Sequence, residues 1–378
     1  MPKGYSTSGD ILTRTRDGQD LNNIWRSYAD ALTEFNATRQ PLVDLLSGSV
    51  TTLIEDIVQP GTNRFEEASE FGIPQSIRTQ PTVTQRAYPF KWYDLRSAYT
   101  FQFLSGGESG EGASAAQLDS IINSAMEADN ALVFQQVMKA LFNNANRTAT
   151  INANPYTVTA LYNADSSWIP SYKGQSFDGA THTHYVASGA ATLDSTDLTD
   201  IAGTVEHHGY TRGEGYNIIL LVNPQEADVI ATFRRGVANN NGQTSLYDFI
   251  PTAGNNFSLM LPPGYTLVGG LNQNQFAGLE VAGSWGPYLI VKDYQIPAGY
   301  MVAAATAGMN TSLNVIGIRE HANAALRGLV LKPGSNNTYP LVDSYFVRGI
   351  GTGVRARGAA AILQVTAGAW SVPSTYAW

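Results

Sequence analysis

Residues 114–144 read SAAQLDSIINSAMEADNALVFQQVMKALFNN, a long run that no proline or glycine interrupts. The run opens with Ser114 and, three residues later, Gln117. This is the pattern of a capping box, in which the two side chains satisfy each other's free backbone N–H groups. At about 1.5 Å per residue, a helix over this run would be roughly 45 Å long. Few helices of single domains need that length, so the sequence predicts a long helix around which the rest of the chain is organised.

The apolar side chains of this predicted helix do not keep to one face. At helical spacing, one face carries Leu118, Ile121, Ile122, Ala125 and Leu132, and another carries Phe134, Val137 and Leu141. A helix with a rotating apolar face must contact different neighbours at its two ends. The pattern fits either a central core helix or a spine that crosses one domain and reaches an adjacent subunit.

Length and composition narrow the class of protein. The chain has 378 residues, enough for two or three compact lobes. Its net charge is −8 and only 14% of its residues are charged, which is low for a freely soluble monomer. Arginine outnumbers lysine by 17 to 6, and arginine suits contacts between subunits because it binds carboxylates bidentately and stacks on rings. The sequence lacks the concentrated basic stretch expected of a tight nucleic-acid binder.

The sequence also lacks the marks of a secreted or membrane protein. It has no cysteine, which excludes disulfides and thiolate metal sites. The N-terminus shows no apolar run of a signal peptide, and no window approaches the roughly 18 apolar residues of a membrane span. We therefore expect a protein of a reducing cell interior, or of a particle assembled inside a cell.

The first part of the chain predicts an arm followed by short elements. Residues 1–18 are polar and rich in Gly, Ser and Thr. Asp20 is the expected cap of an amphipathic helix that runs to about Phe35. A helical turn at 41–46 and a strand at 50–58 follow.

Residues 62–100 predict a long two-stranded ribbon. Two strand-like runs, 65–70 and 88–93, carry charges within them and flank a polar link with two prolines. An isolated ribbon is marginal in water. It therefore either packs on its own chain as a surface hairpin or lies across another molecule.

The remainder of the chain predicts a small α/β layer followed by many strands. Residues 145–190 read as short strands and loops. The expected elements are a helix at 197–208 capped by Ser195 or Asp197, a buried strand at 216–222, a helix at 225–235, and strands at 265–268, 278–281, 288–291, 300–306, 315–319, 328–331, 344–350 and 359–366.

No motif of the chain predicts catalysis. The run Gly349–Gly353 lacks the third glycine of a dinucleotide loop, and Ser109 lacks the final glycine of a nucleophile elbow. His182 and His184 could bind a metal from one strand, but no obvious carboxylate completes the site. We therefore expect no catalytic, cofactor-binding or metal-binding residues, no cofactor, and no enzyme.

The order of these elements resembles one family, the major capsid proteins of tailed bacteriophages with the Hong Kong 97-type fold. The resembling features are the N-terminal arm, the charged loop at about 50–100, the Gly-rich linker SGGESGEG before Ser114, the long helix, and YNIILLVNPQEADVIATFRRG at 216–236. No single motif is diagnostic, and the resemblance rests on order and spacing over nearly the whole chain.

The resemblance implies an α+β fold with five parts. These are an N-terminal arm (1–48), an extended loop with flanking strands (49–104), a peripheral domain with the spine helix at 114–144 (105–194), an axial domain (195–310), and return strands of the peripheral domain with the C-terminus (311–378).

The resemblance also implies a function and partners. The chain would assemble with itself into hexamers and pentamers of an icosahedral virion shell around double-stranded DNA, inside the host bacterial cytoplasm. Its mild acidity fits a container that must not bind its DNA tightly. A short N-terminal arm leads us to expect no fused scaffolding domain, so that any scaffolding protein, decoration protein or portal would be a separate chain. The residues expected at contacts between subunits are Trp25, Arg64, Glu66, Glu67, Glu70, Arg86, Lys91 and Trp92.

Some members of this family link subunits covalently through a loop lysine, an asparagine and a glutamate base. Here Lys91 lies on the loop and Asn336 and Asn337 are candidate acceptors, but no glutamate follows Glu320 and only Asp343 remains. Aspartate is a poor base unless burial raises its pKa. We therefore expect a shell without covalent links.

The sequence alone is also compatible with two other functions. An encapsulin has the same fold and encloses cargo enzymes, although encapsulins are usually shorter. A stand-alone α+β carbohydrate-active enzyme or binding module would instead explain the Trp, Tyr and Asn content. The size of the expressed protein would separate a shell from a monomer.

Overall fold

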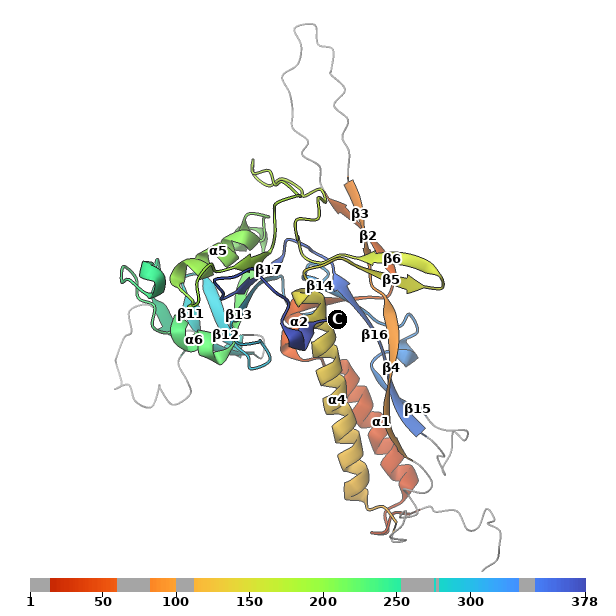
Figure 1. Cartoon of the computed structure of the whole chain (residues 1–378). Coiled ribbons are helices and arrows are strands. Elements are labelled where there is room, and N and C mark those ends of the chain that lie inside the picture. Colours follow the sequence, from red (N-terminus) through yellow and green to blue (C-terminus); the bar gives the residue numbers. More distant parts are fainter. Residues whose placement is uncertain (1–13, 60–81, 100–111, 253–274, 277–278, 333–343) are drawn as a thin grey trace, which may run out of the picture. The chain divides into compact units, whose positions relative to one another are not determined.

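The computed structural model describes residues 14–59, 82–99, 112–252, 275–276, 279–332 and 344–378 (Figure 1). The chain is mixed helix and strand, which confirms the α+β expectation at this level. It separates into two compact units. The first comprises residues 1–40, 90–136 and 319–351, and the second comprises residues 41–89, 137–318 and 352–378.

The helices are α1 (Leu21–Ala37), α2 (Pro41–Leu46), α4 (Ala115–Phe142), α5 (Ser195–Glu206) and α6 (Pro224–Ile230). The strands are β1 (Ser47–Val50), β2 (Ile54–Gln59), β3 (Thr82–Ala87), β4 (Phe90–Tyr99), β5 (Arg147–Ile151), β6 (Asn154–Val158), β7 (Tyr185–Ala187), β8 (Asn217–Val222), β9 (Phe249–Pro251), β10 (Gln275–Phe276), β11 (Leu279–Trp285), β12 (Tyr288–Lys292), β13 (Tyr300–Thr306), β14 (Ile316–Arg319), β15 (Leu329–Lys332), β16 (Ser344–Val354) and β17 (Ala360–Gln364). None of the described helices combines the length and apolar character that a membrane-spanning segment needs.

The long helix forms where the sequence predicts it. The α4 helix has 28 residues, a length of about 42 Å. Both halves of its capping box are present, because Ser114 N–H donates to Gln117 Oε1 at 2.9 Å and Gln117 N–H donates to Ser114 Oγ at 3.3 Å. The burial of α4 changes along its length. Leu118 is buried near its start, whereas successive residues Val137 and Met138 are both fully buried near its end.

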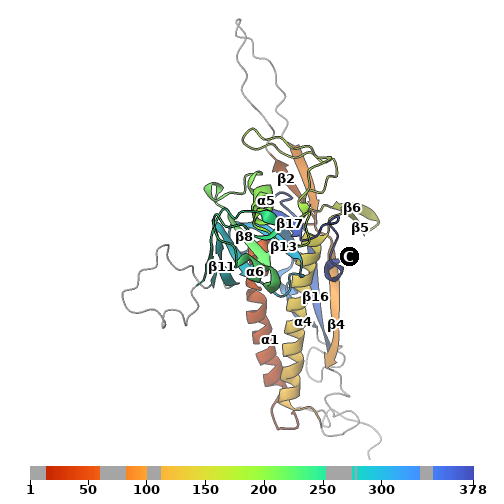
Figure 2. The same cartoon turned by 60° about the vertical axis from the view of Figure 1, so that its left-hand side comes forward.

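In the first unit, α1 and the first part of α4 lie side by side (Figures 1 and 2). Their buried side chains form one core with two strand residues. The members of this core are Leu21, Ile24, Tyr28 and Leu32 of α1, Ala113, Leu118, Ile122 and Ala125, Leu329 of β15 and Phe346 of β16. As predicted, Asp20 caps α1 by accepting from Asn22 N–H at 2.8 Å. Strand β16 pairs antiparallel with both β15 and β4 in this unit.

The second unit is built on an eight-stranded sheet. Its strand order is β10-β11-β12-β8-β13-β17-β7, with β9 also paired to β11. The β8–β12 and β7–β17 pairs are parallel, whereas the β8–β13 and β13–β17 pairs are antiparallel. Helix α5 packs on β13 and β17, and α6 packs on β8 and β12. Strand β8 is almost entirely buried, as its apolar run predicts. Two separate hairpins, β2–β3 and β5–β6, belong to this unit.

The ribbon prediction is wrong in its pairing. The run predicted as its second strand, 88–93, becomes β4 and pairs with β16 rather than with an earlier strand of a ribbon. The described ribbon is instead β2 with β3, in the register Ile54↔Ala87 to Gln59↔Thr82. The predicted run at 65–70 lies outside the described residues. The predicted strand at 50–58 is divided at 51–53, because β1 and β2 belong to different sheets.

Two helix boundaries also differ from the prediction. The cap of α5 is Asp194, which accepts from the N–H groups of Thr196 and Asp197 at 2.9 and 3.3 Å, while Asp197 Oδ2 accepts from Asp194 N–H at 2.9 Å. Helix α6 ends at Ile230 rather than near residue 235. Beyond α6 the backbone makes a long-range hydrogen bond in place of a helical one: the Phe233 carbonyl accepts from Phe249 N–H at 3.1 Å.

Candidate assembly surfaces

A group of three rings lies on and beside β4 in the first unit, of which Trp92 is exposed and Phe90 and His321 are half-buried. Trp92 is 46% exposed, and its ring lies edge-on to Phe90 at 5.2 Å and near His321 at 5.9 Å between centroids. Two cations lie over these rings. The Arg319 guanidinium is 5.5 Å from the Phe90 centroid, and the Lys332 ammonium is 5.8 Å from the Trp92 centroid. We call these five residues the β4 aromatic patch.

The register of β4 on β16 explains how the patch is held. Trp92 pairs with Gly349, and Phe90 pairs with Gly351. A Cβ atom at position 349 would lie 2.3 Å from Phe90 Cζ and 2.9 Å from Trp92 Cζ3, which is closer than atoms can approach. Glycine at 349 therefore lets both rings lie across the neighbouring strand. The patch is thus fixed by the sheet before any partner binds.

The structure places four of the residues predicted at subunit contacts. Trp92 and Lys91 are exposed on β4, and Trp25 is partly buried on α1. Arg86 is buried and its Nε donates to a backbone carbonyl of its own chain at 3.3 Å, which leaves it little surface for a partner. The other four, Arg64, Glu66, Glu67 and Glu70, lie outside the described residues. As contacts between subunits, all eight stay a prediction.

A buried ion pair joins α4 to β16 in the first unit. Arg348 Nη1 lies 3.1 Å from Asp129 Oδ2, and the two side chains are only 8% and 3% exposed. Burial raises the pKa of Asp129 and lowers the pKa of Arg348, and each partner's charge opposes the other's shift. The pair fixes the long helix against β16, the strand that pairs with β4 and so supports the β4 aromatic patch. Sequence reasoning missed it because the partners lie 219 residues apart.

A second set of exposed apolar side chains falls in one stretch of the second unit. Its members are Val237, Leu246, Tyr247 and Ile250. The stretch has a rigid base, because the buried Trp285 ring packs edge-on to Tyr247 at 5.1 Å and its Nε1–H donates to Ser245 Oγ at 3.1 Å. Exposed apolar residues held on a rigid base are typical of surfaces that bind protein.

Arg357 organises the loop that follows the β5–β6 hairpin. Its guanidinium is buried and donates to two backbone carbonyls of this loop and to three side chains. Asp165 Oδ2 accepts one of these bonds at 2.9 Å. Burial by itself would raise the pKa of Asp165, but hydrogen bonds from Ser167 and Asn146 and the Arg357 charge lower it to about 2. Arg357 therefore fixes a segment that has little regular structure of its own.

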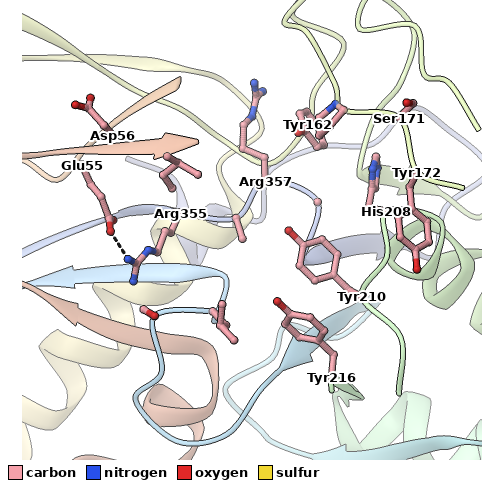
Figure 3. Close-up of a pocket in the computed structure, with 16 residues that line it drawn as sticks. Glu55, Asp56, Tyr162, Ser171, Tyr172, His208, Tyr210, Tyr216, Arg355 and Arg357 are labelled. Carbon is pink, nitrogen blue, oxygen red and sulfur yellow. Dashed lines mark hydrogen bonds and ion pairs between the residues drawn. The ribbon is translucent and has the colours of Figure 1, made fainter. Parts of the chain in front are cut away.

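A cavity of about 510 Å³ lies beside this arginine (Figure 3). Arg357, Tyr162, Tyr210 and His208 line it, and a Glu55–Arg355 ion pair lies on another side. Its lining offers rings, guanidinium groups and carboxylates. The cavity reaches a histidine, and three further histidines surround that one.

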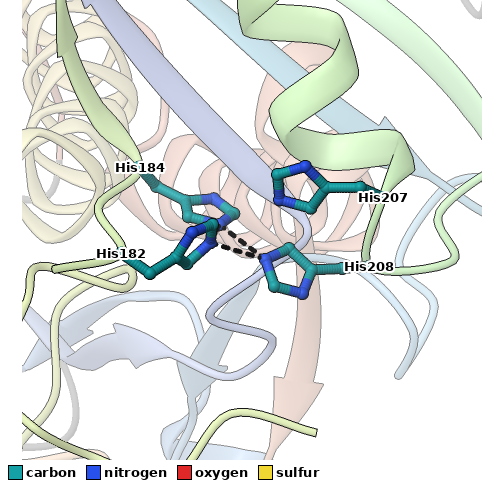
Figure 4. Close-up of side chains that lie close together, drawn as sticks. All are labelled: His182, His184, His207 and His208. Atoms are coloured by element: carbon teal, nitrogen blue, oxygen red, sulfur yellow. Dashed lines mark hydrogen bonds between the residues drawn. The ribbon is translucent and has the colours of Figure 1, made fainter. Parts of the chain in front are cut away.

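The histidines predicted not to form a metal site come together. His182 and His184 precede β7, and His207 and His208 follow α5, so that four rings face one another (Figure 4). One ring nitrogen from each lies within 4.8 Å of the others. Each pair is plain in the sequence, but their meeting depends on β17, which pairs with β7 and packs against α5. A metal site was not predicted because a carboxylate was expected as the further ligand, whereas the structure brings a second histidine pair to the first.

One solved structure decides the family. A chain in a structure from Mycobacterium phage Patience is 40% identical to this one, with a TM-score of 0.73. The match covers 100% of this chain and 97% of that chain. This chain belongs to the family of phage major capsid proteins. The capsid protein is thus a structural component of the virion shell and not an enzyme.

More distant structures match the capsid protein too. They include a capsid of a native GTA particle, at 14% identity, TM-score 0.45 and coverage of 87% of this chain and 91% of that chain. The mature capsid of bacteriophage PhiM1 matches at 10% identity, TM-score 0.46 and coverage of 87% and 88%. Both are too distant to add to the assignment. No family model and no curated protein matches the capsid protein.

The family also decides between the readings left open by the sequence. The full-length identity is to a phage chain, which supports a capsid role over an encapsulin and over a carbohydrate-active enzyme. Capsid proteins assemble with copies of themselves, so the expected self-association is supported at this level.

Proposed function

We propose that the chain forms hexamers and pentamers of an icosahedral shell with the Hong Kong 97-type arrangement, around double-stranded DNA. The observation that carries this is the 40% identity over the full length to a phage chain. In this arrangement α4 is the spine helix of the peripheral domain, and the eight-stranded sheet with α5 and α6 is the axial domain. The proposed boundaries remain 1–48, 49–104, 105–194, 195–310 and 311–378.

Contacts between neighbouring subunits are proposed to use the β4 aromatic patch. Aromatic and arginine side chains are enriched at interfaces, and those held in one conformation lose little entropy on binding. Trp92 meets both conditions, because it is exposed yet packed against Phe90. Lys332, whose ammonium lies over the Trp92 ring, adds a charge that can pair with an acidic neighbour, and the chain has an excess of acidic residues.

The apolar stretch at 237–250 is proposed as the contact around the capsomer axis. Its exposed side chains belong to the unit that carries the axial sheet. Charged substitution there should therefore block capsomers, whereas substitution in the β4 aromatic patch should act on contacts made by the other unit. The two surfaces can be separated by the size of the particle that accumulates.

Replacing Trp92 with alanine tests the β4 aromatic patch. We expect a folded chain that assembles into fewer shells, because hot-spot aromatics at interfaces often contribute about 2 kcal/mol or more each. Trp168→Ala is the matched control, since Trp168 is 42% exposed in the second unit and lies outside both proposed surfaces. Shell yield is measured by sedimentation, and folding by circular dichroism. Equal shell yields from both variants would show that the β4 aromatic patch is not part of the assembly surface.

The role of the extended loop is tested by a deletion. Replacing residues 62–80 with a short Gly/Ser turn leaves the β2–β3 pairing in place. We expect a cooperatively folded chain that makes capsomers but no closed shells. Normal shells from this deletion would show that the loop does not join subunits.

Further partners follow from this proposal. A scaffolding protein, a decoration protein and a portal are proposed as further partners, and assembly is proposed to occur in the host cytoplasm. The net charge of −8 supports only non-specific proximity to packaged DNA.

A further inference from the structure

The histidine cluster lies between two segments whose backbones are already fixed. The His184 N–H donates to the Tyr162 carbonyl at 2.7 Å, and its own carbonyl accepts from Ile362 N–H at 2.8 Å. At the end of α5, His207 N–H donates to Gly203 at 3.0 Å. The rings are therefore held in place by the fold rather than by chance contact of loose loops.

Three ring nitrogens of the cluster form a nearly equilateral triangle. The Nε2 atoms of His182, His184 and His208 lie 2.9, 3.0 and 3.1 Å apart, all within hydrogen-bond distance. The His184 Nδ1 lies 2.6 Å from the Ala360 carbonyl oxygen, which can only accept. Nδ1 therefore carries the proton, and the neutral His184 ring presents a lone pair at Nε2.

No arrangement of protons satisfies this triangle. If His182 and His208 both lack a proton on Nε2, or if only one of them has it, two Nε2 atoms with lone pairs face each other at about 3 Å. If both carry one, their two donors face each other. A single cation bound by all three lone pairs removes it.

The spacing fits a metal ion. At metal–nitrogen distances of about 2.0–2.1 Å, two ligands at a right angle lie about 2.9 Å apart and two at the tetrahedral angle about 3.3 Å apart. The three observed distances fall in this interval. We propose that His182, His184 and His208 bind one divalent transition metal ion through Nε2, with His207 as the fourth ligand, and that the ion is zinc.

His207 supplies the independent observation. Its Nε2 is buried without a hydrogen-bond partner among the described residues. Its ligand nitrogen is within 4.8 Å of the other three, so it needs to approach by at most about 1.5 Å to complete a tetrahedron. The ring is only partly buried, which leaves its side chain room to rotate. It also stands at the C-terminus of α5, where the helix dipole favours a cation.

The chemistry of the ligands points to zinc. Neutral imidazoles suit zinc, copper and nickel, whereas magnesium and calcium prefer oxygen ligands. Four protein ligands without an open position are typical of structural zinc sites. His184 has the hydrogen bond to a carbonyl that ligating histidines usually make through their other nitrogen. The ion would join the segment before β7 to the end of α5, and His208 gives it a route from the cavity.

Metal content tests this proposal directly. The protein is prepared without an affinity tag, stripped with a chelator, dialysed against equimolar zinc and analysed by mass spectrometry of the metal. We expect about one zinc per chain. His208→Gln should lower zinc affinity by more than the roughly 10–100-fold that loss of a ligand's hydrogen-bond partner costs. His321→Gln is the matched control, because His321 is the fifth histidine and lies in the other unit.

Two further measurements use the native sequence and need no variant to fold. Returning zinc to the stripped protein should raise its melting temperature, because the ion binds the folded chain. Cobalt(II) in the site should give the strong visible absorption of a four-coordinate ion. Absence of stoichiometric zinc in the native protein would overturn the proposal, as would equal zinc loss from His208→Gln and His321→Gln. Weak, six-coordinate cobalt absorption would overturn the role of His207 as fourth ligand.

Discussion

Removing Asp129 should destabilise the first unit strongly. Asp129→Ala leaves the Arg348 guanidinium, whose side chain is only 8% exposed, without its charge partner. Loss of one member of a buried ion pair costs about 3–5 kcal/mol, because the remaining charge stays desolvated. This is a large part of the roughly 5–15 kcal/mol that stabilises a typical domain. With a urea dependence of about 3 kcal/mol per molar, the unfolding midpoint should fall by about 1–1.7 M.

The assay is urea unfolding of dissociated capsomers, followed by tryptophan fluorescence. The exposed pair of Lys173 and Glu214, with side chains 69% and 47% exposed, is the control, and Lys173→Ala should cost at most about 1 kcal/mol. Asp129→Leu combined with Arg348→Met should recover most of the loss, because it removes both charges. If Asp129→Ala costs no more than Lys173→Ala, the pair does not hold α4 against β16 and the reasoning is refuted.

Three further outcomes can be measured on the same protein. Leu118→Ala should cost about 2–5 kcal/mol because Leu118 is fully buried, and Leu132→Ala should cost less because Leu132 is only partly buried; equal midpoints would show that α4 packs differently. The pKa of Asp165 is lowered to about 2, so its stabilising contribution should be complete above about pH 4 and be lost as the pH falls towards 2; an acid titration in which Asp165→Asn leaves the profile unchanged would refute this. Boiled shells should give one band near the 40.7 kDa of the chain on a denaturing gel, and a ladder abolished by Lys91→Ala would show covalent links.

Local signals were sufficient for the elements that carry their own caps and patterns. The long helix was predictable because Ser114 and Gln117 mark its start and no helix-breaking residue interrupts it. Strand β8 was predictable from its unbroken apolar run. The second strand of the expected ribbon was misplaced because β4 pairs with β16, more than 240 residues away in sequence. A strand-like run predicts that a segment is extended, but it does not predict which other strand that segment pairs with.

The candidate sites depend on such distant pairings and were mostly hidden. Lys91 and Trp92 could be named because they share one strand, and the structure leaves both exposed. The Arg348–Asp129 pair and the meeting of the two histidine pairs require the fold first. Each of these residues looks ordinary by itself, since an isolated arginine or histidine is most often solvated. Their roles follow from the burial of their side chains and from the distances between them in the folded chain.

Particle size tests the assignment as a capsid protein most directly. The chain is expressed, purified and measured by light scattering after size-exclusion chromatography, with negative-stain microscopy of the same fractions. A shell protein should elute as capsomers or as closed particles in the megadalton range. A stable monomer near 40.7 kDa at every concentration would contradict the account.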